Sequence, residues 1–220
     1  MAAHSARLLI AALAVALAAC GKSPPPFDRE GGTWRYRGTP VAGADHASFA
    51  PLSDHYAKDR ARVYYADTYR DGKEYYSVAH PRVAVIEGAD AATFKVIERG
   101  YARDATHVYF EGERHAVKDI GTFALLDYVF ARDSATAYCH MEPIAGSDPA
   151  SFTVLSGHYA RDRTRVYWCD IEINDASRSP YVKVIPIDAD VGSFALTDLS
   201  DTNADAKDAR GRFSRGKRLP

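Results

Sequence analysis

Apolar and polar positions along this chain follow a spaced pattern that recurs four times. Each copy begins at a Phe preceded by Ser or Thr, with an aliphatic residue three positions on, an aromatic residue at seven, an Asp at ten and a Tyr at fifteen. The second and third copies close at 29 residues, whereas the first and fourth carry insertions at 66–89 and 170–190. Repetition at a fixed period indicates one small structural unit that is stacked several times. The four anchoring residues are Phe49, Phe94, Phe123 and Phe152.

The Asp of each copy lies between two short segments that are rich in aromatic and β-branched residues, which favour strands. A carboxylate in such a place can accept backbone N–H groups as an Asx-turn, so we expect it to close a β-hairpin. These turn aspartates are Asp59, Asp104, Asp133, Asp162 and, in a weaker match near the C-terminus, Asp208.

A second polar position precedes each anchoring Phe, as Asp-x-x-Ser/Thr-Phe. Asp is a favoured helix N-cap, and Pro149 stands at the first helical position, where proline is tolerated. The run that follows is too short for a helix, so the pattern predicts a single capped helical turn. The predicted fold is therefore mainly β, an array of about four to five short β-hairpin repeats with one capped turn each. The predicted cap aspartates are Asp45, Asp90, Asp119, Asp148 and Asp190.

The two ends of the repeat region carry partial copies. Residues 34–38 match the second half of a unit, and residues 206–216 match the first half. A closed ring, in which the ends complete one shared unit, would explain this, and so would an open stack with half-units as caps. We expect an open or loosely closed array.

The repeated Tyr-Ala-Lys/Arg-Asp-x-x-x-Val-Tyr-aromatic string, together with Gly-Ala-Asp-x-x-Ser/Thr-Phe, resembles the DKNYY family of bacterial proteins. The naming motif falls at 59–65, 104–110 and 162–168, and the resemblance covers 33–217. Two features depart from the family pattern: the Lys-Asn after the Asp is replaced, and the third copy has Ala-Tyr-Cys at 137–139. The resemblance implies a secreted or envelope protein built from repeats, and it implies no activity.

The first nineteen residues have the features of a signal peptide. A short positive region precedes an apolar stretch too short to span a bilayer, and residues 17–20 read Leu-Ala-Ala-Cys. This ending resembles the bacterial lipobox, which implies cleavage of 1–19 and acylation of Cys20. An ordinary secretory leader is the alternative. Gly21 stands where Asp would indicate inner-membrane retention. The resemblance thus implies a protein anchored to the outer membrane on its periplasmic side.

Residues 20–32 are rich in proline and glycine and contain three consecutive prolines, which favour extended polyproline II. We expect this segment to be a tether and 33–220 to form the β-repeat domain. No second apolar run is long enough for a transmembrane helix.

Composition adds few constraints. The chain has 220 residues, 46% of them hydrophobic, and a net charge of −1. Without a cationic excess we expect no nucleic-acid partner. The oligomeric state stays open.

Export would place the two remaining cysteines, Cys139 and Cys169, in an oxidising compartment where they could pair. Cys139, however, aligns with Trp168 and not with Cys169, so their side chains would point to opposite faces of superposed strands. The sequence leaves the disulfide open.

The chain contains no recognisable nucleophile, zinc or phosphate-loop motif, so we expect no catalytic residue, metal or cofactor. His55 and His158 occupy equivalent positions; they could be a ligand or acid/base pair, and we favour turn residues. The acidic run 201–208 has oxygen ligands at alternate positions, as calcium loops do, but Arg212 replaces the final Glu, and we expect a solvated loop. The basic end 210–218 could touch anionic lipid, although we favour a charged strand face.

Two classes of function remain. One is a non-enzymatic envelope lipoprotein whose array presents a surface to another protein or to glycan. The other is an enzyme acting on cell-wall or surface glycan, with its site in the 66–89 or 170–190 insertion. A cleft that gathers carboxylates from different units would favour the enzyme, and repeated aspartates that are all bonded to backbone would favour the binding module.

Overall fold

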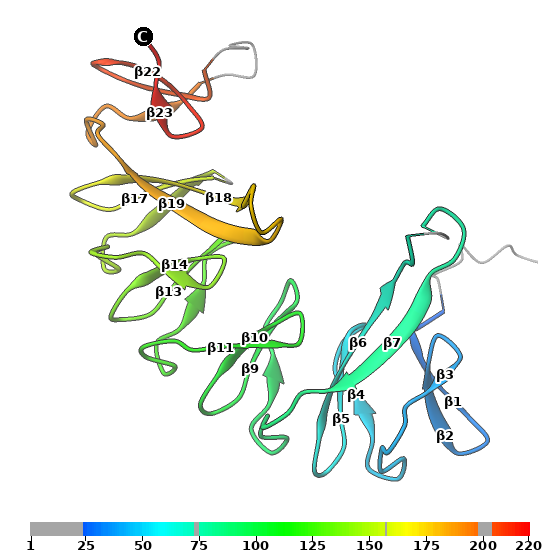
Figure 1. Cartoon of the computed structure of the whole chain (residues 1–220). Coiled ribbons are helices and arrows are strands. Elements are labelled where there is room, and N and C mark those ends of the chain that lie inside the picture. Colours follow the sequence, from blue (N-terminus) through cyan, green and yellow to red (C-terminus); the bar gives the residue numbers. More distant parts are fainter. Residues whose placement is uncertain (1–23, 73–74, 157, 198–203) are drawn as a thin grey trace, which may run out of the picture.

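The computed structural model describes residues 24–72, 75–156, 158–197 and 204–220, and every regular element within them is a β-strand. Six separate antiparallel sheets follow one another in chain order along an open arc (Figure 1). The predicted mainly-β repeat fold is confirmed. Each full unit is a four-stranded sheet, two strands more than a single hairpin.

Every sheet is made of strands that are consecutive in the chain, and we number the sheets from the N-terminus. Sheet 1 has three strands: β1 (Phe27–Glu30), β2 (Thr33–Tyr36) and β3 (Thr39–Pro40). Sheet 2 has β4 (Ala50–Pro51), β5 (Tyr56–Lys58), β6 (Val63–Tyr69) and β7 (His80–Val85). Sheet 3 has β8 (Lys95–Val96), β9 (Tyr101–Arg103), β10 (Val108–Phe110) and β11 (Glu113–His115).

The remaining three sheets have the same order. Sheet 4 has β12 (Ala124–Leu125), β13 (Phe130–Arg132), β14 (Ala137–Cys139) and β15 (Glu142–Pro143). Sheet 5 has β16 (Thr153–Ser156), β17 (Tyr159–Arg161), β18 (Val166–Ile173) and β19 (Pro180–Ile187). Sheet 6 has β20 (Ala195–Leu196), β21 (Ala206–Asp208), β22 (Gly211–Ser214) and β23 (Lys217–Arg218). In the described part of the chain no helix is long and apolar enough to cross a membrane.

Both faces of each inner sheet are buried against its neighbours. Within β5, Tyr56 enters the apolar cluster shared with sheet 3, and the adjacent Ala57 enters the cluster shared with sheet 1. Successive side chains of a strand point to opposite faces, so a strand covered on both sides must be apolar at consecutive positions. This explains runs such as Val63-Tyr64-Tyr65-Ala66, where a strand with one wet face would alternate with polar residues.

The Phe that precedes a sheet lies between aromatic rings of two sheets in four cases: Phe49, Phe94, Phe152 and Phe194. Phe94 packs against Tyr56 of the preceding sheet at 5.5 Å and against Tyr109 of its own sheet at 5.4 Å between ring centroids. Phe194 is held in the same way by Tyr159 and Phe213. Such tilted aromatic pairs contribute about 0.5–1.5 kcal/mol each beyond area burial.

A polar link accompanies this stacking. The Lys or Arg before each turn Asp donates to a backbone carbonyl in the turn that leads into the next sheet. The four links are Lys58 to Ala91, Arg103 to Ile120, Arg132 to Pro149 and Arg161 to Val191.

The outer faces of the terminal sheets are polar. In sheet 1, Arg35 and Glu30 form an ion pair on the face away from the apolar cluster. In sheet 6, Arg212 and Ser214 stand where sheet 2 has Val63 and Tyr65. Polar outer faces on terminal repeats stop a stack from growing or closing. The closed-ring alternative is therefore wrong, and β20 to β23 form a complete four-stranded sheet instead of half a unit.

Two sequence-based boundaries need correction. The segment after each cap aspartate is a hydrogen-bonded turn, such as Ser48 N–H to the Asp45 carbonyl at 3.1 Å; it contains no helix, and the next strand starts one residue beyond the Phe. The predicted tether 20–32 also ends earlier. Phe27 is buried against Tyr36 and Phe49, so β1 belongs to the array, which begins before residue 33.

The short hairpins turn through two residues in the left-handed region, as in Glu111 (φ 49°) and Gly112 (φ 83°). This turn type matches the twist of the flanking strands and favours glycine. At Gly112 there is a second requirement, because an added Cβ would lie 2.7 Å from Cγ of Tyr65 in sheet 2. The glycine therefore sets the spacing of two sheets as well as the turn.

We expect Gly112→Ala to destabilise the protein more than Gly38→Ala. Both glycines have nearly the same φ, 83° and 82°, and both follow an Arg or Glu at positive φ, but nothing lies within 4 Å of a Cβ at Gly38. Backbone strain should cost each variant about 1 kcal/mol, and overpacking on Tyr65 should cost Gly112→Ala about 1–3 kcal/mol more. Urea unfolding measures both, and equal losses would contradict the sheet-spacing role.

Candidate functional site

The turn aspartates are buried and fully engaged in holding the hairpins. Asp104, only 3% exposed, accepts the backbone N–H groups of Thr106 and His107 at 2.7 and 2.8 Å, which closes the β9–β10 turn. It also accepts the N–H of Asp90 at 3.1 Å and the hydroxyl of Tyr109 at 2.7 Å. Asp59, Asp133 and Asp162 repeat this set with their own turns and tyrosines.

These contacts keep the carboxylates ionised. Burial by itself would raise the pKa of Asp59, but hydrogen bonds from Tyr64 and from three backbone N–H groups outweigh it and lower that pKa to about 2. Burial and the neighbouring carboxylate together raise the pKa of Tyr64 to about 12. The pKa of Asp162 is likewise about 2. A carboxylate with filled acceptor sites and a low pKa is unsuited to be a proton donor in catalysis.

The repeated Tyr packs in the core and also donates its hydroxyl to the turn Asp, a role for which the sequence contained a signal. In sheet 6 the equivalent residue is Phe213, which has no hydroxyl, and there Arg218 pairs with Asp208 at 3.1 Å. The turn Asp thus keeps a side-chain donor in every unit. The fixed five-residue spacing of Asp and Tyr was the signal.

The cap aspartates also have structural roles. Asp45 accepts the N–H of Ala47 and the hydroxyl of Ser48, and that hydroxyl accepts the N–H of Arg60 beside the turn Asp. The turn before each sheet is thereby tied to the hairpin turn within it. Asp90, Asp119, Asp148 and Asp190 make the equivalent contacts.

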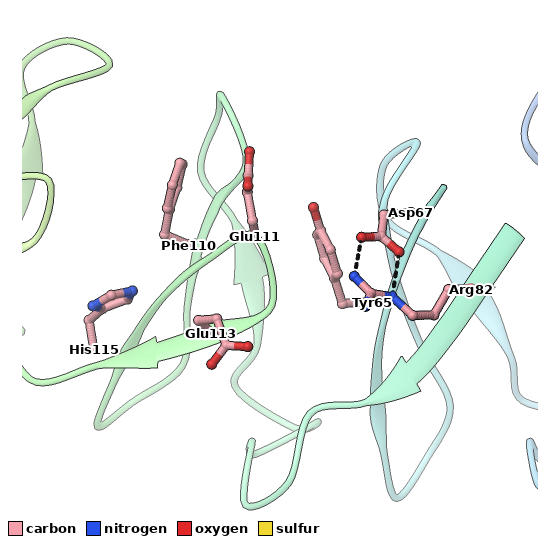
Figure 2. A pocket seen from close by; sticks show the side chains of 7 residues that line it. All are labelled: Tyr65, Asp67, Arg82, Phe110, Glu111, Glu113 and His115. Atoms are coloured by element: carbon pink, nitrogen blue, oxygen red, sulfur yellow. Dashed lines mark hydrogen bonds and ion pairs between the residues drawn. The ribbon is translucent and has the colours of Figure 1, made fainter. Parts of the chain in front are cut away.

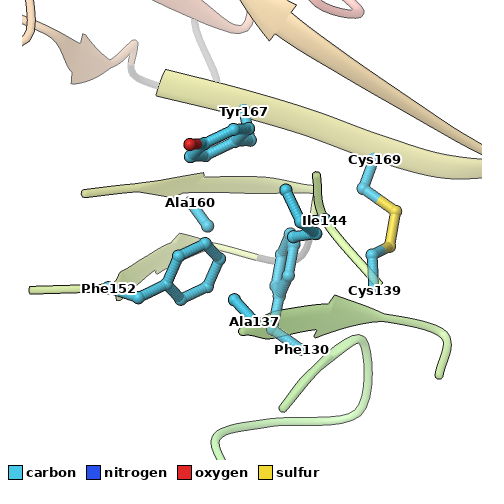
Figure 3. Close-up of a cluster of buried hydrophobic side chains, with 8 residues drawn as sticks. All are labelled: Phe130, Ala137, Cys139, Ile144, Phe152, Ala160, Tyr167 and Cys169. Atoms are coloured by element: carbon cyan, nitrogen blue, oxygen red, sulfur yellow. A yellow bond between two sulfur atoms is a disulfide. The ribbon is translucent and has the colours of Figure 1, made fainter. Parts of the chain in front are cut away.

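The structure joins Cys139 of β14 and Cys169 of β18 in a disulfide between sheets 4 and 5, with the Cα atoms 6.5 Å apart (Figure 3). The opposed faces that argued against pairing are what make it possible. Stacked sheets present the forward face of one unit to the backward face of the next, so residues on opposite faces of equivalent strands meet. Phe130 and Tyr167 pack beside the bridge.

His55 and His158 share two structural contacts. Nδ1 of each lies within hydrogen-bond distance of a carbonyl at the base of a long hairpin, Ala66 at 2.8 Å and Cys169 at 3.0 Å. Each ring also stacks near an aromatic residue of β6 or β18. Each of the two histidines therefore contacts the base of a long hairpin, in the two units that carry insertions.

The acidic run and the basic end lie largely within the described residues, whereas Cys20 lies outside them. In the acidic run 201–208, Asp205 accepts the Tyr159 hydroxyl and the Arg215 N–H, and residues 201–203 lie outside the described residues, as does Cys20. The basic end 210–218 includes β22 and β23, where Arg210 pairs with Asp188 at 2.9 Å. Within the described ranges no three His, Cys, Asp or Glu side chains are placed to hold a metal.

The two insertions form long hairpins, β6–β7 and β18–β19. Both project from the concave side of the arc (Figure 1). The β6–β7 ladder runs from the Tyr64–Val85 pair to the Tyr69–His80 pair, and the β18–β19 ladder from Val166–Ile187 to Ile173–Pro180. They are the main departures from regular repetition, so the concave side is where a unit-specific function would lie.

A cleft of about 400 Å³ lies between the β6–β7 hairpin and the β10–β11 hairpin of sheet 3. Figure 2 shows the Arg82–Asp67 pair on one side and Glu111 and Glu113 on the other. Arg82 binds Asp67 through two hydrogen bonds of 2.9 and 2.5 Å. The cleft thus brings carboxylates of two sheets together, which the sequence could not place. The aromatic and imidazole residues of its lining are Tyr65, Phe110 and His115.

The electrostatics of the cleft favour a cationic or hydroxylated ligand group. Three carboxylates face one guanidinium, which is already paired with Asp67. Burial lowers the pKa of His115, so its ring is neutral at neutral pH, and burial raises the pKa of Tyr65 to about 12. Aromatic walls beside carboxylates suit the face of a sugar or the amine of a basic side chain.

The model of one protein family, described as the DKNYY family, matches residues 68–141 and 130–215. No curated protein and no solved structure matches the chain.

We expect Tyr64→Phe to lose about 1–3 kcal/mol of unfolding free energy at pH 7, because it removes a hydrogen bond to the buried Asp59 carboxylate. The folded-state pKa of Asp59 lies below its unfolded value of about 3.9, so this stabilisation is complete above that pH and is lost as pH falls toward 2. Urea unfolding between pH 7 and 2 measures both effects. Tyr65→Phe, one position along, is the control, and a Tyr64→Phe variant as stable as the control at pH 7 would refute the pairing.

Reduction of the disulfide should cost about 2–4 kcal/mol, since it releases a loop between cysteines 30 residues apart. Hydrogen exchange should rise at the interface of sheets 4 and 5, around Phe130 and Tyr167, and stay unchanged around Phe49. The Cys139→Ala/Cys169→Ala protein provides the control, because reductant should not change it. Equal exchange with and without reductant in the natural protein would count against the bridge.

Proposed function

The chain belongs to the DKNYY family, and we propose that it is a non-enzymatic lipoprotein of the outer membrane, facing the periplasm, whose concave side binds another envelope component. The partner is an envelope protein or a glycan strand. The leader and Cys20 support the location. So does the bridge between Cys139 and Cys169, because disulfides persist in oxidising compartments such as the periplasm.

The binding role is supported mainly by a contrast between two sides of the array: the edge with the turn and cap aspartates and the concave side with the long hairpins. On the edge with the turn and cap aspartates, the repeated polar groups bond to backbone and to one another. The concave side holds the long hairpins and the cleft lined by Tyr65, Glu111 and Glu113. Extended concave surfaces are the usual binding surfaces of repeat arrays.

A glycan-acting enzyme is the second candidate, because the cleft gathers Asp67 from one sheet with Glu111 and Glu113 from the next. The Asp67 carboxylate has both oxygens bonded to Arg82, which removes it from acid/base work. The cleft is also open to solvent. These features favour binding over hydrolysis.

The binding role is tested in intact envelopes with the full-length, anchored chain. A photo-crosslinking amino acid at Glu113 in the cleft should give a discrete crosslinked product. The same group at Ala105, exposed on the aspartate edge of the same sheet, is the matched control and should give none. Products at neither position, or equally at both, would overturn the concave-side assignment.

Two further readouts separate the parts of the proposal. Palmitate labelling should disappear in Cys20→Ala, and label that persists would overturn the anchoring. Release of soluble fragments from purified cell-wall glycan, lost in Glu111→Gln or Glu113→Gln, would overturn the non-enzymatic assignment in favour of the enzyme.

A further inference from the structure

The end of the β6–β7 hairpin carries a group of exposed apolar side chains that we call the aromatic tip: Tyr69, Tyr75, Tyr76 and Val78. Tyr76 is 96% exposed, and its ring meets that of Tyr75 edge to face at 5.3 Å. Arg70 donates to the Tyr75 carbonyl at 3.0 Å and so ties the rings to the strand end. A cluster of exposed tyrosines is costly in water and indicates a surface that something covers.

The other long hairpin shows that such a tip is not needed to close the turn. The end of β18–β19 is formed by Asn174, Asp175, Ala176, Ser177 and Arg178. There the Asn174 side chain accepts the N–H groups of Ala176 and Ser177 at 3.0 Å each. The turn of β18–β19 is thus polar, with Ile173 and Tyr181 exposed on the adjoining strands, whereas Tyr75 and Tyr76 lie beyond the last strand pair of β6–β7.

The chain enters the fold at the base of the hairpin with the aromatic tip. The Pro26 carbonyl accepts the N–H of Arg37 at 2.7 Å, which places it at the β2–β3 turn. This turn occupies in sheet 1 the position that the β6–β7 hairpin occupies in sheet 2. Phe27 shares an apolar cluster with Ala66 and Val83, residues of that hairpin. The segment leading back to Cys20 therefore starts from the concave side.

The two lengths agree. Seven residues separate Cys20 from Phe27, and a chain of that length can reach at most about 25 Å. At about 3.4 Å per residue, the hairpin extends on the order of 15 Å from Ala66 to the turn beyond Tyr69. A lipid attached at Cys20 and the aromatic tip can thus meet the same plane.

We propose that the aromatic tip rests in the headgroup layer of the bilayer to which the acylated Cys20 is attached. Tyrosine has an apolar ring and a polar hydroxyl, which is why it is enriched at membrane interfaces. Arg70 adds a guanidinium beside the rings that suits lipid phosphates. The inference rests on the proposed lipid anchoring, and it adds a second contact that fixes the orientation of the arc.

The test uses the full-length acylated chain in phospholipid vesicles. A Tyr76→Cys variant is labelled with an environment-sensitive fluorophore, and brominated lipids are the quencher. We expect quenching of about two-fold or more at this position, because a group in the interface contacts the lipid chains. Ala176→Cys, at the tip of β18–β19, is the matched control and should stay unquenched. The side chain of Tyr76 is almost fully exposed, so the substitution should leave the fold intact.

Flotation of the same samples distinguishes the two levels of the inference. Protein that floats with the vesicles and is quenched at 76 but not at 176 supports the proposal. Protein that floats but is not quenched at 76 overturns the tip contact and leaves the anchoring in place. Protein that does not float overturns the anchoring and the tip contact together.

Discussion

The buried aspartate at each hairpin turn is the interaction on which the array depends. A carboxylate out of contact with water is costly unless donors surround it. Asp104 finds its donors in three separate segments: its own turn, the turn before the sheet, and the tyrosine of the next strand. It therefore fixes the turn from which its sheet begins and the face of the sheet on which Tyr109 lies. The aromatic stacking between sheets follows from that choice.

Much of this architecture could be read from the sequence because its causes are local. The spacing from Phe94 to Asp104 to Tyr109 reports turns and strands that are set by neighbouring residues. Which side chains face each other across two sheets, in contrast, depends on how whole sheets stack and not on neighbouring residues. Cys139 and Cys169 meet because whole sheets stack forward face to backward face, and a comparison of superposed strands cannot show this. Phe27 was assigned to the tether because its partner Tyr36 lies across a turn that the repeat pattern does not include.

The site was even less accessible to sequence reasoning. The sequence shows where the two insertions lie, but the residues opposite them could not be known. Glu111 and Glu113 lie beside a short turn in a regular unit, where nothing in the sequence marks them as different from solvent-exposed charges. Their place in the cleft comes from the projection of β6–β7 across the neighbouring sheet.

Every strand in the described residues pairs only with strands of its own unit, and no backbone ladder joins one sheet to the next. The units are thus joined by side chains and by the single chain that passes between them. An in-frame duplication or deletion of one short unit in the gene would preserve all ladders and would re-form equivalent aromatic contacts at the new junction. The reach of the arc is then a property that evolution can change in whole units, independently of the polar faces at its two ends and of the two long hairpins.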